Sequence, residues 1–355
     1  MAQSPAVPPP NQPALAPPPG VPAEFFSPFT LRPYQALTIV ASVLTTTVMV
    51  AARLYTKKFI VKALKWEDYT CLVGWATFIA YLGVEWSIGT HGGGTHMWNL
   101  HYSQVQYQKR FGNYEDILYS VSLFFTKCSI LLLIIRVFYS VKHDFGYWLS
   151  QALIVVNAMF YLAFFFVPIF QCSPRTKIWT PEEPGRCLDV DALYLASASF
   201  NVVSDIAMLS IPIYLIWNLQ MSAQRKIGVS AIFAAGALAC IASIVRLVFR
   251  VNLTKTEDYS YVKFQGVLWA MAEIACGLLC SCLVVLPRLY QHLASITPHN
   301  SESDTLARAM VDQNNPTPQS KRDWIQLHNR NDGSLPSPPS EAYKEWQRER
   351  GGTGA

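Results

Sequence analysis

Charged residues are scarce in this sequence, and their scarcity excludes an ordinary soluble domain. Asp, Glu, Lys and Arg make up 14% of the 355 residues, whereas apolar residues make up 51%. That balance is typical of membrane proteins. The net charge of +5 is spread along the chain and forms no basic stripe of the kind that binds nucleic acid. We therefore expect no nucleic-acid partner.

Catalytic signatures are also missing. The chain contains no GxSxG elbow, no HExxH pair and no phosphate-binding P-loop. We predict that it is not an enzyme and that it holds no cofactor. The first twenty residues lack both a charged n-region and an apolar h-region, so we expect no cleaved signal peptide.

What the sequence does contain is a series of seven apolar runs, each near the roughly 20 residues that cross a bilayer. They predict helices at about 34–52, 69–88, 117–139, 147–170, 192–217, 227–249 and 262–286. The predicted fold is all-α, a polytopic membrane protein whose seven-transmembrane-helix bundle occupies residues 34–290. The Pro-rich residues 1–33 and the Ser- and Pro-rich residues 291–355 are predicted to be disordered tails.

Lys and Arg in the short loops indicate the orientation, because they accumulate on the cytosolic side. Nine fall on each side, so the count alone does not decide. The first loop is the densest and usually dominates, and it predicts an outside N-terminus and a cytosolic C-terminal tail. Its basic residues are Arg53, Lys57, Lys58, Lys62 and Lys65.

Two cysteines bracket the loop between the fourth and fifth spans. Cys172 and Cys187 lie outside in this topology, where disulfides persist. We predict that they pair, since no other cysteine lies in a loop, and closure stabilises by about 3 kcal/mol on a chain-entropy estimate. The others are expected to be packing residues, with a metal or palmitoyl site at the last three as the alternative. These six are Cys71, Cys128, Cys240, Cys276, Cys280 and Cys282.

Three charged residues, Lys127, Asp205 and Glu273, lie near the middle of apolar runs. A charge there costs about 2.5–3.5 kcal/mol or more unless it is paired or hydrated. Asn201, Ser204 and Asp205 follow an i, i+3, i+4 pattern, so they share one helix face that must point into the bundle.

We expect Lys127 to pair with Asp205 or Glu273. Two carboxylates and one ammonium would leave one acid to titrate, or to hold a water or cation. Nearer the outer face, Glu85 and Arg246 lie at similar depth and could pair. Two interpretations of this intramembrane polar network stay open, interhelical stabilisation and a ligand or switch site, because both need the same geometry.

The predicted outer loop GTHGGGTHMW contains His91 and His96. Two imidazoles could bind a metal, but no third ligand is evident, so we interpret the loop as a flexible turn and expect no metal. The following HYSQVQYQKRFGNYED alternates aromatic and polar residues, which predicts an amphipathic segment lying in the membrane interface. Asn252 opens an Asn-Leu-Thr sequon, a candidate glycosylation site close to the predicted membrane edge.

Several stretches carry a family resemblance: GTHGGGTH, FTKCSILLLIIRVF, QCSP…W…GRC, NVVSDIAMLSIPIYLIWNLQM, IFAAGALACIASIVRL and WAMAEIACGLLCSCLVVLPRL. Together they resemble the fungal rhodopsin-domain family of seven-span membrane proteins over about residues 34–290. That family includes GPCR-like receptors linked to pathogenicity and the membrane protein of the satratoxin gene cluster. Its name suggests light sensing, yet the seventh predicted run, taken from Phe264, has no Lys for a Schiff base. We therefore expect no retinal.

The resemblance and the buried charges together predict a GPCR-like receptor or sensor of unknown ligand in the plasma membrane. Its expected partners are membrane lipid, a small-molecule ligand and a cytosolic signalling protein such as a G protein. The short loop 218–226 counts against coupling, because it offers little surface. One alternative is a proton-linked transporter that titrates Asp205 and Glu273. Another is an accessory membrane protein of a secondary-metabolite gene cluster.

Overall fold

The computed structural model describes residues 13–25, 28–138, 145–180, 182–217, 223–289 and 292. The chain divides into two units, residues 1–290 and residues 291–355. Apart from residue 292, the second unit lies outside the described residues, and so does the prediction that it is disordered.

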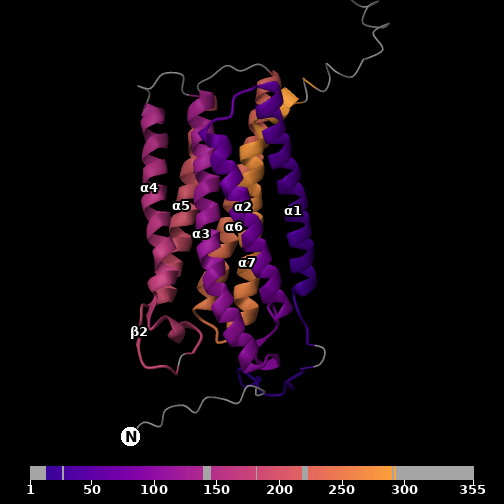
Figure 1. The fold of residues 1–355 in the computed structure, drawn as a ribbon, viewed down its shortest axis with the longest axis vertical. Helices are drawn as coiled ribbons and strands as arrows, with labels where there is room; N and C mark the ends of the chain where they lie inside the picture. The colour runs from indigo at the N-terminus through magenta and orange to yellow at the C-terminus, as the bar shows by residue number, and fades with distance from the viewer. Residues whose placement is uncertain are drawn as a thin grey trace, which may run out of the picture. The chain divides into compact units, whose positions relative to one another are not determined.

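Long helices make up almost all of the described first unit (Figure 1). Seven of them contain a stretch long and apolar enough to cross a membrane, which confirms the predicted all-α, seven-span architecture. They are α1 (Arg32–Tyr55), α2 (Trp66–Thr90), α3 (Tyr102–Phe138), α4 (Phe145–Phe170), α5 (Val190–Trp217), α6 (Ala223–Leu253) and α7 (Tyr259–Leu283).

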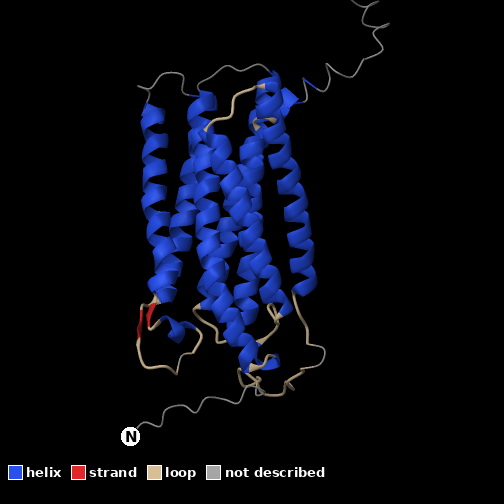
Figure 2. Cartoon of the chain, viewed as in Figure 1, coloured by secondary structure: helices blue, strands red, loops and turns tan. Residues whose placement is uncertain are grey.

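The connections add only short elements (Figure 2). A π-helical turn, η1 (Thr56–Ile60), extends α1, and 3-10 turns η2 (Met97–Asn99) and η3 (Arg175–Ile178) lie in two loops. Strands β1 (Cys172–Ser173) and β2 (Arg186–Cys187) pair antiparallel between α4 and α5. We call the end of the bundle that carries this hairpin the disulfide end, and the end that carries loop 61–65 the opposite end.

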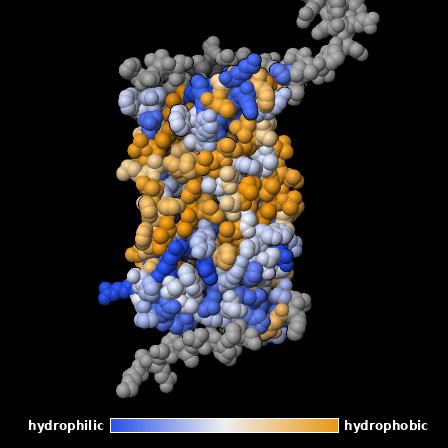
Figure 3. All heavy atoms as spheres, viewed as in Figure 1, coloured by the Kyte–Doolittle hydropathy of each residue, from blue (hydrophilic) through white to orange (hydrophobic). Residues whose placement is uncertain are grey.

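Helices α3 and α7 form the centre of the bundle. In their membrane-spanning windows 56% and 61% of residues are buried, compared with 22% in α1, α4, α5 and α6. The outer helices turn apolar side chains outward, as Leu37, Val40, Leu44 and Val48 do along one face of α1. Figure 3 shows an apolar belt around the visible face of the bundle, between two hydrophilic ends. The belt is the surface expected to face lipid hydrocarbon, so the polar residues inside must find partners within the bundle.

The predicted interfacial segment after the Gly-rich loop is wrong, because helix α3 already begins at Tyr102. With 37 residues, α3 is about 55 Å long at about 1.5 Å per residue, well beyond the roughly 30 Å of a hydrocarbon core. Residues 102–116 stay helical because one face of this part of α3 is buried in the protein. Val105 and Gln108 on that face are 3% and 5% exposed.

The loop GTHGGGTH is a tethered turn. Gly92 and Gly94 adopt φ values of 88° and 78°, in the left-handed region that favours glycine. A side chain on Gly94 would come within 2.7 Å of the Phe264 ring, so the close approach to α7 also requires glycine. The Leu31 amide donates to the Gly94 carbonyl at 3.1 Å, which fixes the turn against the start of α1.

Part of the Pro-rich N-terminal segment lies against this same loop region. The Ala14 amide donates to the Leu100 carbonyl at 2.9 Å, and the Glu24 amide donates to the Asn99 side chain at 2.9 Å. The Phe25 ring stacks on His101 with centroids 4.9 Å apart. Residues 13–25 therefore have defined contacts, whereas residues 1–12 lie outside the described ranges.

Candidate functional site

Lys127 lies at the centre of a buried polar network that joins five helices. Its ammonium lies 2.8 Å from the Asp205 carboxylate and donates to the Asn201 side-chain oxygen at 2.6 Å. The Tyr161 hydroxyl of α4 donates to that same oxygen at 2.6 Å. Ser204 donates instead to Asn157 of α4 at 2.8 Å. The three polar residues of α5 thus face into the bundle, as their helical spacing predicts.

Glu273 of α7 holds the second half of this central network. Its carboxylate accepts from the Tyr119 hydroxyl at 2.9 Å, from the Arg246 guanidinium at 3.0 Å and from the Ser243 hydroxyl at 2.6 Å. The Asn201 amide also donates to it. Glu273 is 2% exposed, so these donors replace the water that the carboxylate lacks.

The central network is electrically balanced, which corrects the predicted excess of one acid. Lys127 and Arg246 offset Asp205 and Glu273 one for one. Sequence reasoning assigned Arg246 elsewhere, to Glu85, and that pairing is wrong. Helix α6 packs chiefly on α7 and α5, so the carboxylate within reach of Arg246 is Glu273.

Two adjoining cavities lie toward the disulfide end of the bundle, and the volume given for each includes space that is open to solvent. The larger, which we call the cleft, has about 400 Å³ and lies between α3, α6 and α7. Tyr119 and Arg246 of the central network form part of its wall. The smaller has about 280 Å³ and is lined by Glu85 of α2, so we call it the Glu85 cavity. The ion pair Lys263–Glu115, at 2.8 Å, borders both.

The position of Lys263 corrects the expectation that the seventh span contains no lysine. Helix α7 begins at Tyr259, so it contains a lysine after all. Lys263 lies in the second turn, near the disulfide end, and its ammonium is paired with Glu115. The absence of bound retinal stays a prediction. It can no longer be argued from the absence of a lysine in the seventh helix.

A third group of buried charges, at the opposite end, was missed by sequence reasoning. Arg53 pairs with Asp68 at 2.9 Å, and Lys57 contacts Glu67 at 3.3 Å and Asp68 at 3.7 Å. Arg136 of α3 reaches Glu67 as well. The loop count places Arg53 and Lys57 in the basic loop between the first two spans, yet both are buried, at 1% and 4% exposed. The sequence signal for this group was the acidic pair Glu67-Asp68, which follows the basic loop and could have indicated ion pairs with it.

The two outer-loop histidines do not come together. His91 bonds to the Ser87 carbonyl at 2.8 Å and stacks on Tyr107. His96 contacts the Asp258 carboxylate at 2.5 Å, which ties this loop to the start of α7. Within the described ranges, no group of three His, Cys, Asp or Glu side chains is placed to hold a metal ion.

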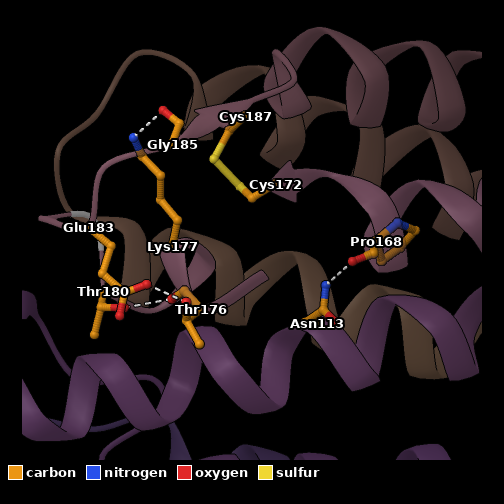
Figure 4. Close-up of a disulfide and its surroundings, with 9 residues drawn as sticks. All are labelled: Asn113, Pro168, Cys172, Thr176, Lys177, Thr180, Glu183, Gly185 and Cys187. Carbon is orange, nitrogen blue, oxygen red and sulfur yellow. Dashed lines mark hydrogen bonds between the residues drawn. A yellow bond between two sulfur atoms is a disulfide. The ribbon is translucent and has the colours of Figure 1, made fainter. Parts of the chain in front are cut away.

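The predicted disulfide Cys172–Cys187 forms across the β1–β2 pair (Figure 4). Within the loop, Lys177 donates to the Gly185 carbonyl at 2.7 Å. From α3, Asn113 donates to the Pro168 carbonyl of α4 at 2.7 Å. These bonds fix the hairpin at the disulfide end.

Two further features concern the same end. The Tyr102 hydroxyl donates to Glu182 at 2.5 Å, and this bond lowers the pKa of that exposed carboxyl. Asn252 of the sequon lies exposed in the last turn of α6.

The six remaining cysteines all lie in helices; five are buried and Cys276 is half-buried, as packing residues would be.

Seven apolar helices around a buried polar network define an integral, multi-pass membrane protein. The chain belongs to the fungal rhodopsin domain family, whose model matches residues 52–292.

The curated relatives include proteins of biosynthetic clusters. A SAT4 family membrane protein of Emericella nidulans is 41% identical over 231 residues, which are 64% of this chain and 58% of that protein. The match thus spans less than two thirds of that relative's length. Fugralins biosynthesis cluster protein 2 of Gibberella zeae is 29% identical over 80% of this chain and 72% of its own. Satratoxin biosynthesis SC1 cluster protein 4 of Stachybotrys chartarum is 28% identical over 46% and 59%. No solved structure matches the chain.

Proposed function

We propose that the chain is a GPCR-like receptor or sensor for a small molecule, and that it is not an enzyme. One observation carries this proposal: the cleft and the central network share Tyr119 and Arg246. Both side chains line the cleft, and both bind the Glu273 carboxylate. A molecule in the cleft would therefore touch the groups that hold α6 and α3 to α7.

Such contacts can act as a switch because a ligand shifts an equilibrium only by binding two states differently. A ligand that engages Arg246 competes with Glu273 for the guanidinium. Asn201 links Glu273 to Lys127, so a change at Arg246 has a direct route to the Lys127–Asp205 pair between α3 and α5. Lys127 and Asp205 belong to α3 and α5, and both of these helices extend to the opposite end of the bundle.

The disulfide supports placing the disulfide end outside the cell, since disulfides persist in oxidising compartments. The cleft then lies in the outer half of the bundle, and the opposite end faces the cytosol. We propose the plasma membrane as the location, a small molecule as the ligand and a heterotrimeric G protein as the cytosolic partner. Part of the α5–α6 connection, residues 218–222, lies outside the described residues.

The test is basal and ligand-dependent association with a heterotrimeric G protein in fungal cells. Asp205→Asn removes the charge that pairs with Lys127 and should raise association in the absence of ligand. Asp191→Asn is the matched control, because Asp191 lies exposed in the first turn of the same helix. If no condition produces association while the protein reaches the plasma membrane, the receptor proposal fails.

A second candidate function is an accessory role beside a biosynthetic gene cluster. The names of the Gibberella zeae and Stachybotrys chartarum relatives favour it. Deletion of the gene, followed by profiling of secreted metabolites, tests this role. A lost or altered metabolite that returns with the wild-type gene supports it, and an unchanged profile counts against it.

A further inference from the structure

Glu85 is the buried acid for which the described structure provides no donor. It is 1% exposed, and neither carboxylate oxygen accepts a hydrogen bond from a basic or neutral donor; its side chain lies instead against the carboxyl group of Glu115, a second acid. The other buried acids on the described helices differ: Glu115, Asp205, Glu273, Glu67 and Asp68 each face a cation within 4 Å. From α1, Gln35 reaches only the Glu85 backbone carbonyl, at 2.7 Å.

The cavity beside Glu85 contains oxygen atoms suited to a cation. Its walls include Gln108 of α3 and Ser260 of α7, whose hydroxyl donates to the Gln108 side-chain oxygen at 2.8 Å. The Gln108 amide is directed elsewhere, to the His91 carbonyl at 3.2 Å. Apolar Ile88, Phe264 and Val267 complete the lining. The cavity therefore combines an anionic group, neutral oxygens and an apolar wall.

Among the described residues, acids outnumber cations around Glu85: Glu115 and Asp116 both act on it, and Lys263 is the cation that does. Lys263 is the cation of this cavity, and it is already paired with Glu115 at 2.8 Å. In the neighbouring cleft, Arg246 is paired with Glu273. The titratable groups that act on Glu85 are Glu115 and Asp116 of α3 and Lys263 of α7, and Tyr259 of α7 lines the same cavity. Glu85 also acts on Tyr81 of α2, which lies within reach of Tyr119 of α3 and Arg246 of α6.

A buried carboxylate without a donor or counter-charge is strongly disfavoured, so a group in this position gains a proton or a cation. We propose that Glu85, with Gln108 and Ser260, forms a site for one monovalent cation, either an inorganic ion or a small primary ammonium. The cation replaces the carboxyl proton of Glu85, which passes to water at the mouth of the cavity. The exchange conserves charge inside the bundle. It does not depend on the receptor role, because it can be measured on the purified chain alone.

Competition with a proton makes the binding pH-dependent. Where Glu85 is protonated, the apparent affinity for the cation falls about tenfold for each unit by which the pH is lowered. The experiment uses the purified full-length chain in detergent and follows its thermal unfolding at two pH values. Sodium chloride and methylammonium chloride are added in separate arms, with N-methylglucamine chloride as the control for ionic strength. A cation at about ten times its Kd should raise the ratio of folded to unfolded protein about elevenfold.

Glu85→Gln removes the titrating group and keeps the side-chain shape, and Glu257→Gln is the matched exposed control. We expect sodium or methylammonium to raise the unfolding midpoint of wild type and Glu257→Gln, more at the higher pH, and to leave Glu85→Gln unchanged. The arm that responds identifies the source of the cation. An equal rise in Glu85→Gln, or no rise with either cation at either pH, would overturn the proposal.

Infrared spectroscopy supplies a readout that does not depend on whether the variant folds. The carbonyl stretch of a protonated carboxyl should be present in wild type without the cation and should disappear when the responding cation is added at constant pH. A band that is insensitive to both cations contradicts the exchange.

Discussion

Lys127 keeps its charge in the middle of the bundle because oxygens surround its ammonium. Asp205 supplies a carboxylate at 2.8 Å, and Asn201 supplies its side-chain oxygen at 2.6 Å and its backbone carbonyl at 3.4 Å. A buried pair of this kind is weak evidence for stability, because desolvation offsets much of the attraction. Removing one partner is different, since the remaining charge is then buried alone.

The first prediction is a double-mutant cycle on this pair. Lys127→Met should lower the free energy of unfolding by about 3–5 kcal/mol, because it leaves Asp205 buried without its cation. Adding Asp205→Leu should restore most of the loss, since both charges are then absent. Unfolding in mixed detergent and SDS micelles measures Lys127→Met, Asp205→Leu and the double variant. Lys58→Met, at an exposed lysine of η1, is the control and should change little. Additive losses in the double variant would show that the two residues are not coupled.

The sequence allows the charged members of the central network to be found, and helical spacing adds Asn201 and Ser204, but other neutral members escape it. Lys127, Asp205 and Glu273 stand out because a charge is rare in an apolar run. Tyr119 and Ser243 give no such signal, since a tyrosine or serine in a span is ordinary. Pairing also escapes sequence reasoning, because it depends on which helices are neighbours and at what depth their side chains meet.

At the level of helices, two glycines set the closest approach in the core. A side chain on Gly277 of α7 would come within 2.8 Å of the Thr126 methyl group of α3. On α2, a side chain on Gly74 would meet Thr126 at 3.1 Å. Thr126 is thus held between two glycines, and α2, α3 and α7 pack closely around it, as small residues permit in membrane helices.

The second prediction concerns this packing. Gly277→Leu should destabilise the bundle by about 1–3 kcal/mol, because overpacking forces the helices apart. Gly83→Leu is the matched control, since an added Cβ atom there meets nothing within 4 Å. Thermal unfolding of both variants in one detergent gives the comparison. Equal midpoints for the two variants would contradict a close contact at Gly277.

The third prediction concerns the β1–β2 hairpin. Cys187→Ser opens a loop closed over a sequence separation of 15, and the chain-entropy estimate for that length is about 3 kcal/mol. We expect a lower unfolding midpoint and faster proteolysis between residues 174 and 186. Cys276→Ser, in the half-buried part of α7, should leave the proteolysis rate unchanged. Wild type treated with reductant should reproduce the Cys187→Ser pattern; if neither differs from untreated wild type, the disulfide does not stabilise this loop.

Helix positions were predictable, and every helix end but one lies within a few residues of its predicted place. Apolar run length locates all seven spans, whereas α3 starts fifteen residues before its predicted start because residues 102–116 are half polar. They remain helical through contacts with the Gly-rich loop and α7, such as the bond from Gln108 to the His91 carbonyl. Tertiary contacts of this kind leave no periodic apolar pattern.

Across the whole bundle, buried charges occur at three depths. The cluster of Arg53, Lys57, Glu67, Asp68 and Arg136 lies at the opposite end, the central network lies in the middle, and Glu85, Glu115 and Lys263 lie toward the disulfide end. The central network is neutral, and the Glu85 cavity has an excess acid. A proton or cation therefore changes the internal charge most readily at the disulfide end. Whether that end meets the exterior decides which solution supplies the ion.

The fourth prediction settles that orientation. A cysteine introduced at Lys255, exposed between α6 and α7, should react with a membrane-impermeant thiol reagent on intact cells, because the disulfide end is expected outside. A cysteine introduced at Lys62, which is also exposed, in the loop between α1 and α2, should react only after permeabilisation. The unmodified chain controls for the native cysteines, which are buried, half-buried or disulfide-bonded. The reverse pattern would place the Cys172–Cys187 bond in the cytosol, where thiols are kept reduced, and would turn the cleft and the Glu85 cavity toward the cell interior. Both proposed sites would then have to draw their ligands from the cytosol, which is incompatible with a receptor for external molecules.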